Sequence, residues 1–203
     1  MNIARIVEEL RQGNLVIAPT DTVYGILADA TNPKAVEQVF DCKQRQGKAL
    51  ILLAADVEML REYVAPLNDL EELIVKNYTP GKLTLLLRKN AKISDAVTCG
   101  SKFVGMRIPD NSDYVRIIRS VGCPIIATSA NVSGQPVATC LAEVPDSLRQ
   151  QVALVEDGGV LTGEPSSIIK VVDDQVVIYR DGETIGRMRE QWPEVRFRRY
   201  FDR

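Results

Sequence analysis

The hydrophobic positions of the chain switch repeatedly between helical spacing and short continuous apolar runs. Apolar residues within 3–10 recur every three or four positions, as in a helix that packs one face on a core, and Gly13 is a natural stop for that helix. The run LVIA at 15–18 is typical of a buried strand that ends at Pro19. The same succession continues along most of the chain, which predicts an α/β fold with helices covering a sheet.

Five more strands and five more helices follow from the same pattern. The strands are predicted at 49–54, 83–88, 103–108, 124–128 and 152–156. The helices are predicted from Asn32-Pro33 to Phe40, after the cap Asp56, at about 68–77, through Tyr114 to Ile118, and near 141–150. A hairpin is predicted over 167–180, around Asp173-Asp174. Hairpin strands are antiparallel, so a purely parallel sheet is unexpected.

The chain of 203 residues suits one medium-sized domain, since no linker, repeat or low-complexity segment interrupts it. We expect a single domain over 1–203, with a core at about 3–182 and a C-terminal extension at 183–203. The extension is rich in arginine and aromatic residues. It is expected to pack its aromatic side chains on the body, and contact with RNA is the alternative.

Composition narrows the classes of function. The chain is 45% hydrophobic and 26% charged with a formal net charge of -2, which gives no general attraction to nucleic acid or membranes. It has no apolar run near the roughly 20 residues of a membrane span and no signal-peptide core, so a cytoplasmic protein is expected. Four cysteines without a CxxC pair and no histidine argue against a zinc site held by protein ligands. The lack of histidine also excludes Ser-His and Cys-His hydrolases.

Three cations lie within six positions after a predicted helix. Lys43, Arg45 and Lys48 repel one another unless something anionic lies between them. This spacing predicts an anion site, and a solvated helix end favoured by the helix dipole is the alternative.

Polar residues also gather where predicted strands end. PTDTVYG places Thr20, Asp21, Thr22 and Tyr24 at the carboxyl end of a strand, where open α/β sheets bind ligands. A hydrogen-bonded turn is the alternative. Arg107 and Arg180 each end a strand, and each is expected to face a structural carboxylate or an anionic ligand.

The segment PIIATSANVSG at 124–134 is the most specific of these motifs. Its small side chains let a ligand approach the backbone, and Ser129 and Asn131 add hydrogen-bonding groups suited to phosphate oxygens. SSIIKV adds Ser166 and Ser167 before another strand. The chain has neither GxxxxGK[ST] nor GxGxxG, so it is neither a P-loop nor a Rossmann dinucleotide site.

These segments together resemble the YrdC/Sua5 family. The matching strings cover about residues 3–182 in the family's order: PTDTVYGI, KQR, GKALILLA, TPGKLTLLL, VGMRIPDN, PIIATSANVSGQP, SSIIKV and VIYRDG. The resemblance implies an α/β fold with a twisted, mixed parallel and antiparallel open sheet. Helices would lie on both sides of the sheet, around a concave cationic cavity. The chain is similar to the single-domain bacterial type.

The resemblance also implies an activity, that of an L-threonylcarbamoyladenylate synthase. L-Threonine, bicarbonate and ATP, with Mg²⁺ on the triphosphate, would give threonylcarbamoyl-AMP and pyrophosphate. The product would serve N6-threonylcarbamoylation of adenosine 37 in tRNAs that read ANN codons. The implied partners are a downstream threonylcarbamoyl-transferase complex and possible contacts with tRNA or double-stranded RNA, without a membrane.

The same resemblance implies roles for particular residues. The catalytic set would be Lys43, Arg45, Ser129 and Asn131. ATP would contact this set together with Lys48, Thr84 and Arg180. L-Threonine would be held by Thr20, Thr22, Tyr24, Arg107 and Ser167.

The chain departs from many relatives at three points, because Gln46, Ala49 and Lys82 stand where prolines are common. These changes alter loop rigidity more than charge. Two rival functions remain open: a non-catalytic module that binds double-stranded RNA or nucleotides, and an enzyme that adenylates a different carbamoyl donor, as the YrdC-like domain of hydrogenase maturation proteins does. The latter domain belongs to much larger chains with zinc fingers.

Overall fold

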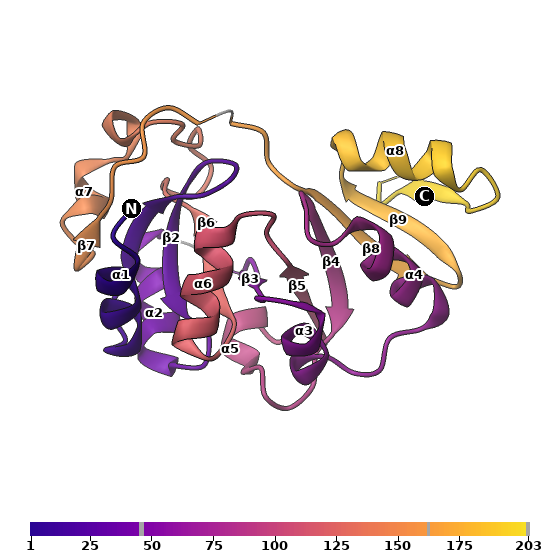
Figure 1. Cartoon of the computed structure of the whole chain (residues 1–203), viewed down its shortest axis with the longest axis horizontal. Coiled ribbons are helices and arrows are strands. Elements are labelled where there is room, and N and C mark those ends of the chain that lie inside the picture. Colours follow the sequence, from indigo (N-terminus) through magenta and orange to yellow (C-terminus); the bar gives the residue numbers. More distant parts are fainter. Residues whose placement is uncertain (45–46, 162, 202–203) are drawn as a thin grey trace.

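The chain folds around one ten-stranded mixed sheet. The structure, a computed structural model, describes residues 1–44, 47–161 and 163–201. The strands are β1 (Val16–Pro19), β2 (Tyr24–Asp29), β3 (Ile51–Leu53), β4 (Leu83–Arg88), β5 (Phe103–Arg107), β6 (Ile125–Ser129), β7 (Leu154–Val155), β8 (Ser167–Val172), β9 (Gln175–Arg180) and β10 (Phe197–Arg199). Their order across the sheet is β10-β9-β8-β4-β5-β3-β6-β2-β1-β7 (Figure 1). Parallel and antiparallel pairs both occur, so the expected mixed sheet is confirmed.

The helices are α1 (Ile3–Arg11), α2 (Pro33–Cys42), α3 (Val57–Tyr63), α4 (Asp69–Tyr78), α5 (Asp95–Thr98), α6 (Ser112–Val121), α7 (Asp146–Arg149) and α8 (Glu183–Gln191), with a 3₁₀ turn at Leu141–Glu143. Side-chain caps explain where several begin. Asn32 accepts hydrogen bonds from the first turn of α2, Asp56 caps α3, and Asn68 forms a capping box with Glu71 at α4. The predicted helix near 141–150 is instead split in two at Pro145.

The sheet has two apolar faces because successive side chains of a strand point to opposite sides. Val16 and Ala18 of β1 pack in one cluster with residues of α1 and α6. Ile17 between them belongs to the other cluster, with residues of α2, α4 and α8. Helices therefore cover both faces, as the sequence predicts (Figure 1).

Strand β2 and the short helix α5 are not among the predicted elements. The PTDTVYG segment was expected at the polar end of one strand. In the structure it connects the two strands of a hairpin, in which Pro19 of β1 pairs with Tyr24 of β2. Thr20 Oγ1 accepts hydrogen bonds from the backbone N–H groups of Thr22 (3.0 Å) and Val23 (3.1 Å), which closes the turn. Thr20 and Thr22 are thereby fixed at the carboxyl end of β1.

The C-terminal extension belongs to the same sheet. Strand β10 pairs in parallel with β9. Trp192, at the end of α8, is buried with its ring 5.0 Å from that of Tyr78 in an edge-on contact. Trp192 thus packs on the body as expected, whereas Phe201 of the same extension is 83% exposed.

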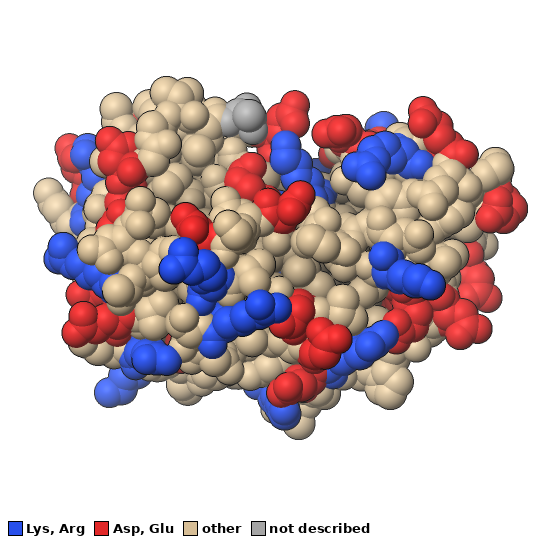
Figure 2. Space-filling model, in the orientation of Figure 1, with Lys and Arg blue, Asp and Glu red and all other residues tan. Residues whose placement is uncertain are grey.

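The surface carries both signs of charge. Figure 2 shows Lys and Arg side chains interspersed with Asp and Glu side chains over the face it presents, so that face has no continuous basic area among its described residues. No helix in the described part of the chain is long and apolar enough to cross a membrane.

Candidate functional site

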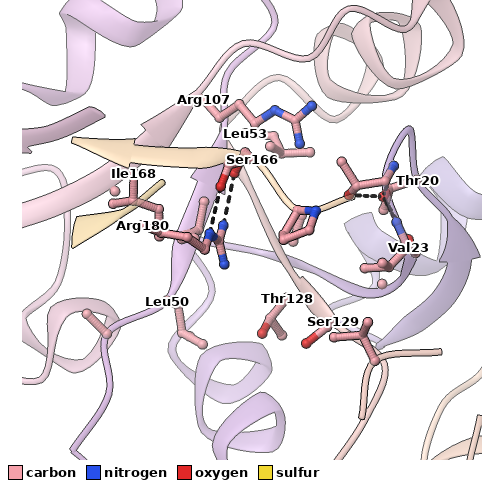
Figure 3. A pocket seen from close by; sticks show the side chains of 18 of the residues that line it. Thr20, Val23, Leu50, Leu53, Arg107, Thr128, Ser129, Ser166, Ile168 and Arg180 are labelled. Atoms are coloured by element: carbon pink, nitrogen blue, oxygen red, sulfur yellow. Dashed lines mark hydrogen bonds between the residues drawn. The ribbon is translucent and has the colours of Figure 1, made fainter. Parts of the chain in front are cut away.

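A cavity of about 800 Å³ is lined by residues of the central strands and of the loops beside them. This volume lies within the usual range for ligand sites. The lining comes from segments far apart in the sequence: Thr20, Asp21, Thr22, Val23, Gly25, Lys48, Ala49, Leu50, Ile51, Leu53, Leu86, Gly105, Arg107, Ala127, Thr128, Ser129, Val137, Pro165, Ser166, Ile168, Tyr179 and Arg180. Figure 3 shows Arg180 and Ile168 on one side, Thr20 and Val23 on the opposite side, and Thr128 and Ser129 between them.

The described lining of the cavity has more positive than negative side chains. It includes Lys48, Arg107 and Arg180, against the single carboxylate of Asp21. The excess of positive charge in a concave site favours an anionic ligand.

Arg107, at the end of β5, is held by groups on two sides. Its Nε donates to the carbonyl of Gly81 (2.8 Å), and one terminal nitrogen donates to the carboxylate of Asp21. Burial lowers the pKa of Arg107 from its usual value, and the charge of Asp21 opposes that shift. The structural carboxylate expected beside this strand-end arginine is therefore Asp21, and both residues still line the cavity.

Arg180, at the end of β9, is held through neutral groups. Its Nε donates to the carbonyl of Ser166 (2.6 Å), and a terminal nitrogen donates to the Ser166 hydroxyl (3.1 Å) (Figure 3). That hydroxyl in turn lies 2.9 Å from Thr84 Oγ1. Within residues 1–44, 47–161 and 163–201 no carboxylate lies within ion-pair distance of Arg180. Burial and the nearby charge of Arg107 both lower the pKa of Arg180 from its usual value.

The turn after β6 is built on Lys43. The Lys43 side chain is only 2% exposed, and its Nζ donates to the carbonyls of Ser129 and Asn131, the latter at 2.8 Å. Asn131 Nδ2 donates to the carbonyl of Gln135 (2.6 Å), while its Oδ1 accepts from the Ser129 hydroxyl. The Ser-x-Asn turn is thus one closed network, with Ser129 at the cavity wall.

The structure divides the residues predicted for the site into three groups. Those that line the cavity are Thr20, Thr22, Lys48, Arg107, Ser129 and Arg180. Those that lie behind its wall are Tyr24, Lys43, Thr84, Asn131 and Ser167. Arg45 lies outside the described residues, as does Gln46.

Tyr24 and Ser167, two of the residues behind the wall, contact protein groups outside the cavity. Tyr24 donates its hydroxyl to Asp157 Oδ1 (2.9 Å) and accepts from the N–H of Gly158 (2.8 Å). Ser167, the first residue of β8, points away from the cavity because its neighbours Ser166 and Ile168 line it, and its hydroxyl lies against Gly182. Any direct contact of these side chains with a ligand stays a prediction.

Sequence reasoning assigned no role to several lining residues. Asp21 stands inside PTDTVYG, and its position between two predicted threonines was the available signal. Ser166 was considered beside Ser167, and the structure places Ser166 on the wall. The apolar lining, which includes Leu50 and Tyr179, carries no sequence signal that distinguishes it from the core.

The chain is similar to a known protein family and to several named proteins. A model of the family Sua5_yciO_yrdC, described as Telomere recombination, matches residues 8–182. The chain is 38% identical over 178 residues to a putative threonylcarbamoyl-AMP synthase of Methanocaldococcus jannaschii, which covers 86% of this chain and 83% of that protein. It is 36% identical over 183 residues to the threonylcarbamoyl-AMP synthase of Bacillus subtilis, which covers 89% of this chain and 53% of that protein.

A solved structure has the same fold. The crystal structure of P. abyssi Sua5 in complex with L-threonine matches with a TM-score of 0.89 and 30% identity, over 97% of this chain and 58% of that one. This chain therefore spans somewhat more than half the length of the Bacillus and Pyrococcus proteins.

Proposed function

This chain belongs to the Sua5, YciO and YrdC family, and we propose that it is a threonylcarbamoyl-AMP synthase. The observation that carries the proposal is the cavity that Arg107 and Arg180 both line, with Asp21, the partner of Arg107, as the single carboxylate of its described lining. Its volume of about 800 Å³ has room for a nucleotide and an amino acid together.

The reaction needs charge and positioning more than proton transfer by a side chain. The amine of L-threonine adds to CO₂ derived from bicarbonate and forms a carbamate. A carbamate oxygen then bonds to the α-phosphorus of ATP, and the bond to the pyrophosphate leaving group breaks. Negative charge moves onto the pyrophosphate, so fixed cations and N–H donors lower the barrier. A chain without histidine suits this chemistry.

Arg180 and Lys48 are the cations that we assign to the phosphates of ATP. Among the described residues Arg180 has only the neutral groups of Ser166 as partners, which leaves its charge available to phosphate oxygens. Mg²⁺ would arrive with the triphosphate as part of the substrate. Arg45 is assigned to the same task from the motif alone, and Thr84 supports Arg180 through Ser166.

The threonine side of the cavity lies at the hairpin connection of β1 and β2. Asp21 is the carboxylate that would face the amine of the amino acid, while Arg107 neutralises Asp21 and adds a cation near the substrate carboxylate. Thr20 and Thr22 present hydroxyls 2.9 Å apart at the same wall. Lys43 and Asn131 serve indirectly in this proposal, since they hold Ser129 against the cavity.

Pyrophosphate release by the purified chain tests the proposed function. We expect release from ATP only when L-threonine and bicarbonate are both present, and omission of either should return the rate to background. Release that does not depend on threonine would contradict the proposal. Tight binding of duplex RNA in the absence of ATP, without any threonine-dependent release, would favour the RNA-binding alternative instead.

The product would pass to a threonylcarbamoyl-transferase complex that acts on tRNA. Addition of that complex and an ANN-decoding tRNA to the assay should consume threonylcarbamoyl-AMP and modify adenosine 37. Failure of transfer while pyrophosphate release persists would separate the synthase activity from this partner assignment.

A further inference from the structure

The C-terminal extension contacts the residues on both sides of Arg180, which are Tyr179 in β9 and Asp181 just after that strand. The ring of Tyr179 stacks on the ring of Tyr200, with centroids 4.3 Å apart and planes 23° from parallel. Asp181 Oδ2 accepts a hydrogen bond from the guanidinium of Arg199 at 3.1 Å. Arg180, a cavity cation with no carboxylate partner in the described part of the chain, therefore stands between two residues that the extension holds.

A β-bulge explains why this support matters. Arg180 pairs with Ile168 of β8, but the next pair joins Ile178 to Ile169, so Tyr179 is an extra residue in β9. Neighbouring residues of a regular strand point to opposite faces, whereas Tyr179 and Arg180 both line the cavity. Bulges turn side chains in this way and leave the extra residue without its ladder partner.

The extension supports β9 along the edge of that strand that does not pair with β8. Strand β10 lies in parallel beside β9, with Arg199 opposite Ile178, and the N–H of Tyr200 donates to the carbonyl of Ile178 at 2.9 Å. This pairing ends just before the bulge, and the Tyr200 ring then covers Tyr179. The extension thus meets β9 at the point where pairing with β8 is irregular.

We propose that the C-terminal extension positions Arg180 for the triphosphate of ATP, with Tyr200 and Arg199 as positioning residues. Tyr200 fixes the bulged Tyr179 by stacking, and Arg199 fixes Asp181 by its ion pair. The choice of ATP as the ligand rests on the proposed function. Tyr200 is 40% exposed and its hydroxyl has no hydrogen-bond partner among the described residues, so its ring is the part that acts.

The experiment compares four variants of the full-length chain. Tyr200→Ala removes the stacked ring and Tyr200→Phe keeps it. Arg199→Gln removes the ion pair with Asp181. Arg196→Gln removes the same charge from an exposed position just before β10 and is the matched control. ATP affinity is measured by calorimetric titration, and the KM values for ATP and L-threonine come from pyrophosphate release.

We expect Tyr200→Ala to weaken ATP binding and raise the KM for ATP about tenfold, the range of one aromatic stacking contact. The KM for threonine should change less than about twofold, because Tyr200 acts through Tyr179 and Arg180 alone. Arg199→Gln should have a smaller effect of about threefold, since its ion pair is exposed. Tyr200→Phe and Arg196→Gln should match the wild type.

Emission from Trp192, the single tryptophan of the chain, reports whether the extension stays docked against Tyr78. A Tyr200→Ala chain that melts at a lower temperature but binds ATP with wild-type affinity would show a purely structural contact and overturn the proposal. Loss of duplex RNA binding with unchanged ATP affinity would overturn it as well.

The two proposals fail in different ways. A wild-type chain that binds ATP but releases no pyrophosphate with threonine refutes the proposed function alone, and the comparison of ATP affinities still decides the role of Tyr200. Equal ATP affinity in all variants refutes the positioning role alone. A wild-type chain that does not bind ATP refutes both.

Discussion

Lys43 and Asn131, 88 positions apart in the sequence, are joined by a 2.8 Å hydrogen bond from the lysine Nζ to the asparagine carbonyl. The same Nζ also donates to the carbonyl of Ser129. Lys43 caps the carboxyl end of α2, so the bond ties that helix to the turn after β6. Two motifs that are separate in the sequence therefore share one buried junction behind the cavity wall.

Replacement of Lys43 by methionine should destabilise the fold. The variant keeps the length of the side chain but leaves the Asn131 carbonyl without a donor among the described residues, while the Ser129 carbonyl keeps only the N–H of Asn131. The loss costs about 1–3 kcal/mol in the free energy of unfolding. Urea denaturation measures the change. Lys34→Met, on the exposed face of the same helix, is the control and should change stability by less than about 0.5 kcal/mol. If Lys43→Met loses activity with unchanged stability, Lys43 acts on the ligand directly.

Replacement of Arg180 by glutamine should weaken ATP binding with little effect on threonine binding. Charge-assisted hydrogen bonds to phosphate are lost, which we expect to reduce ATP affinity by about 10- to 100-fold. Titration calorimetry with ATP and with L-threonine separates the two effects. Arg88→Gln, an exposed arginine at the end of β4, is the charge control. Equal losses in both variants would point to a general electrostatic effect.

Two glycines close in sequence should respond in opposite directions to alanine. A Cβ at Gly182 would lie 2.7 Å from the buried hydroxyl of Ser167, so Gly182→Ala should cost about 1–3 kcal/mol by overpacking. A Cβ at Gly186, inside α8, meets nothing within 4 Å, so Gly186→Ala should stabilise the chain by about 0.5–1 kcal/mol. Thermal unfolding measures both. Ser167→Ala combined with Gly182→Ala should recover part of the loss, and no recovery would disprove the clash.

Buried cysteines should resist alkylation in the native chain. Burial raises the pKa of the Cys42 thiol to about 11, and burial together with the hydrogen bond to Asp29 raises that of Cys123 to about 12. Because both pKa values lie well above 8, the two thiols stay protonated at pH 8. The reactive thiolate of each cysteine should form only as the pH rises toward its pKa. We expect iodoacetamide at pH 8 to label exposed Cys99 first, as followed by mass spectrometry of peptides. Equal labelling of Cys42 and Cys99 would indicate that α2 opens readily.

Much of the fold follows from local sequence. The starts of three helices can be predicted from their N-cap residues, Asn32, Asp56 and Asn68. A short polar side chain at this position accepts hydrogen bonds from the free N–H groups of the first helical turn. The Asp173-Asp174 turn of the β8–β9 hairpin is also visible, since both residues accept the positive φ that such a turn requires. Strand β2 was missed because its buried run begins inside a polar motif, and pairing with β1 and β6 decided its conformation.

The sequence by itself determined which chemical groups are available to the site. It supplied strand-end arginines and a Ser-x-Asn turn without histidine, and these depend on residue type and local spacing. Only the tertiary structure decided which groups reach the cavity. Asp21 neutralises Arg107, Arg180 has only neutral partners among the residues described, and Lys43 turns inward to hold Ser129. These outcomes depend on strand order, a β-bulge and burial, which bring together residues that no local pattern connects.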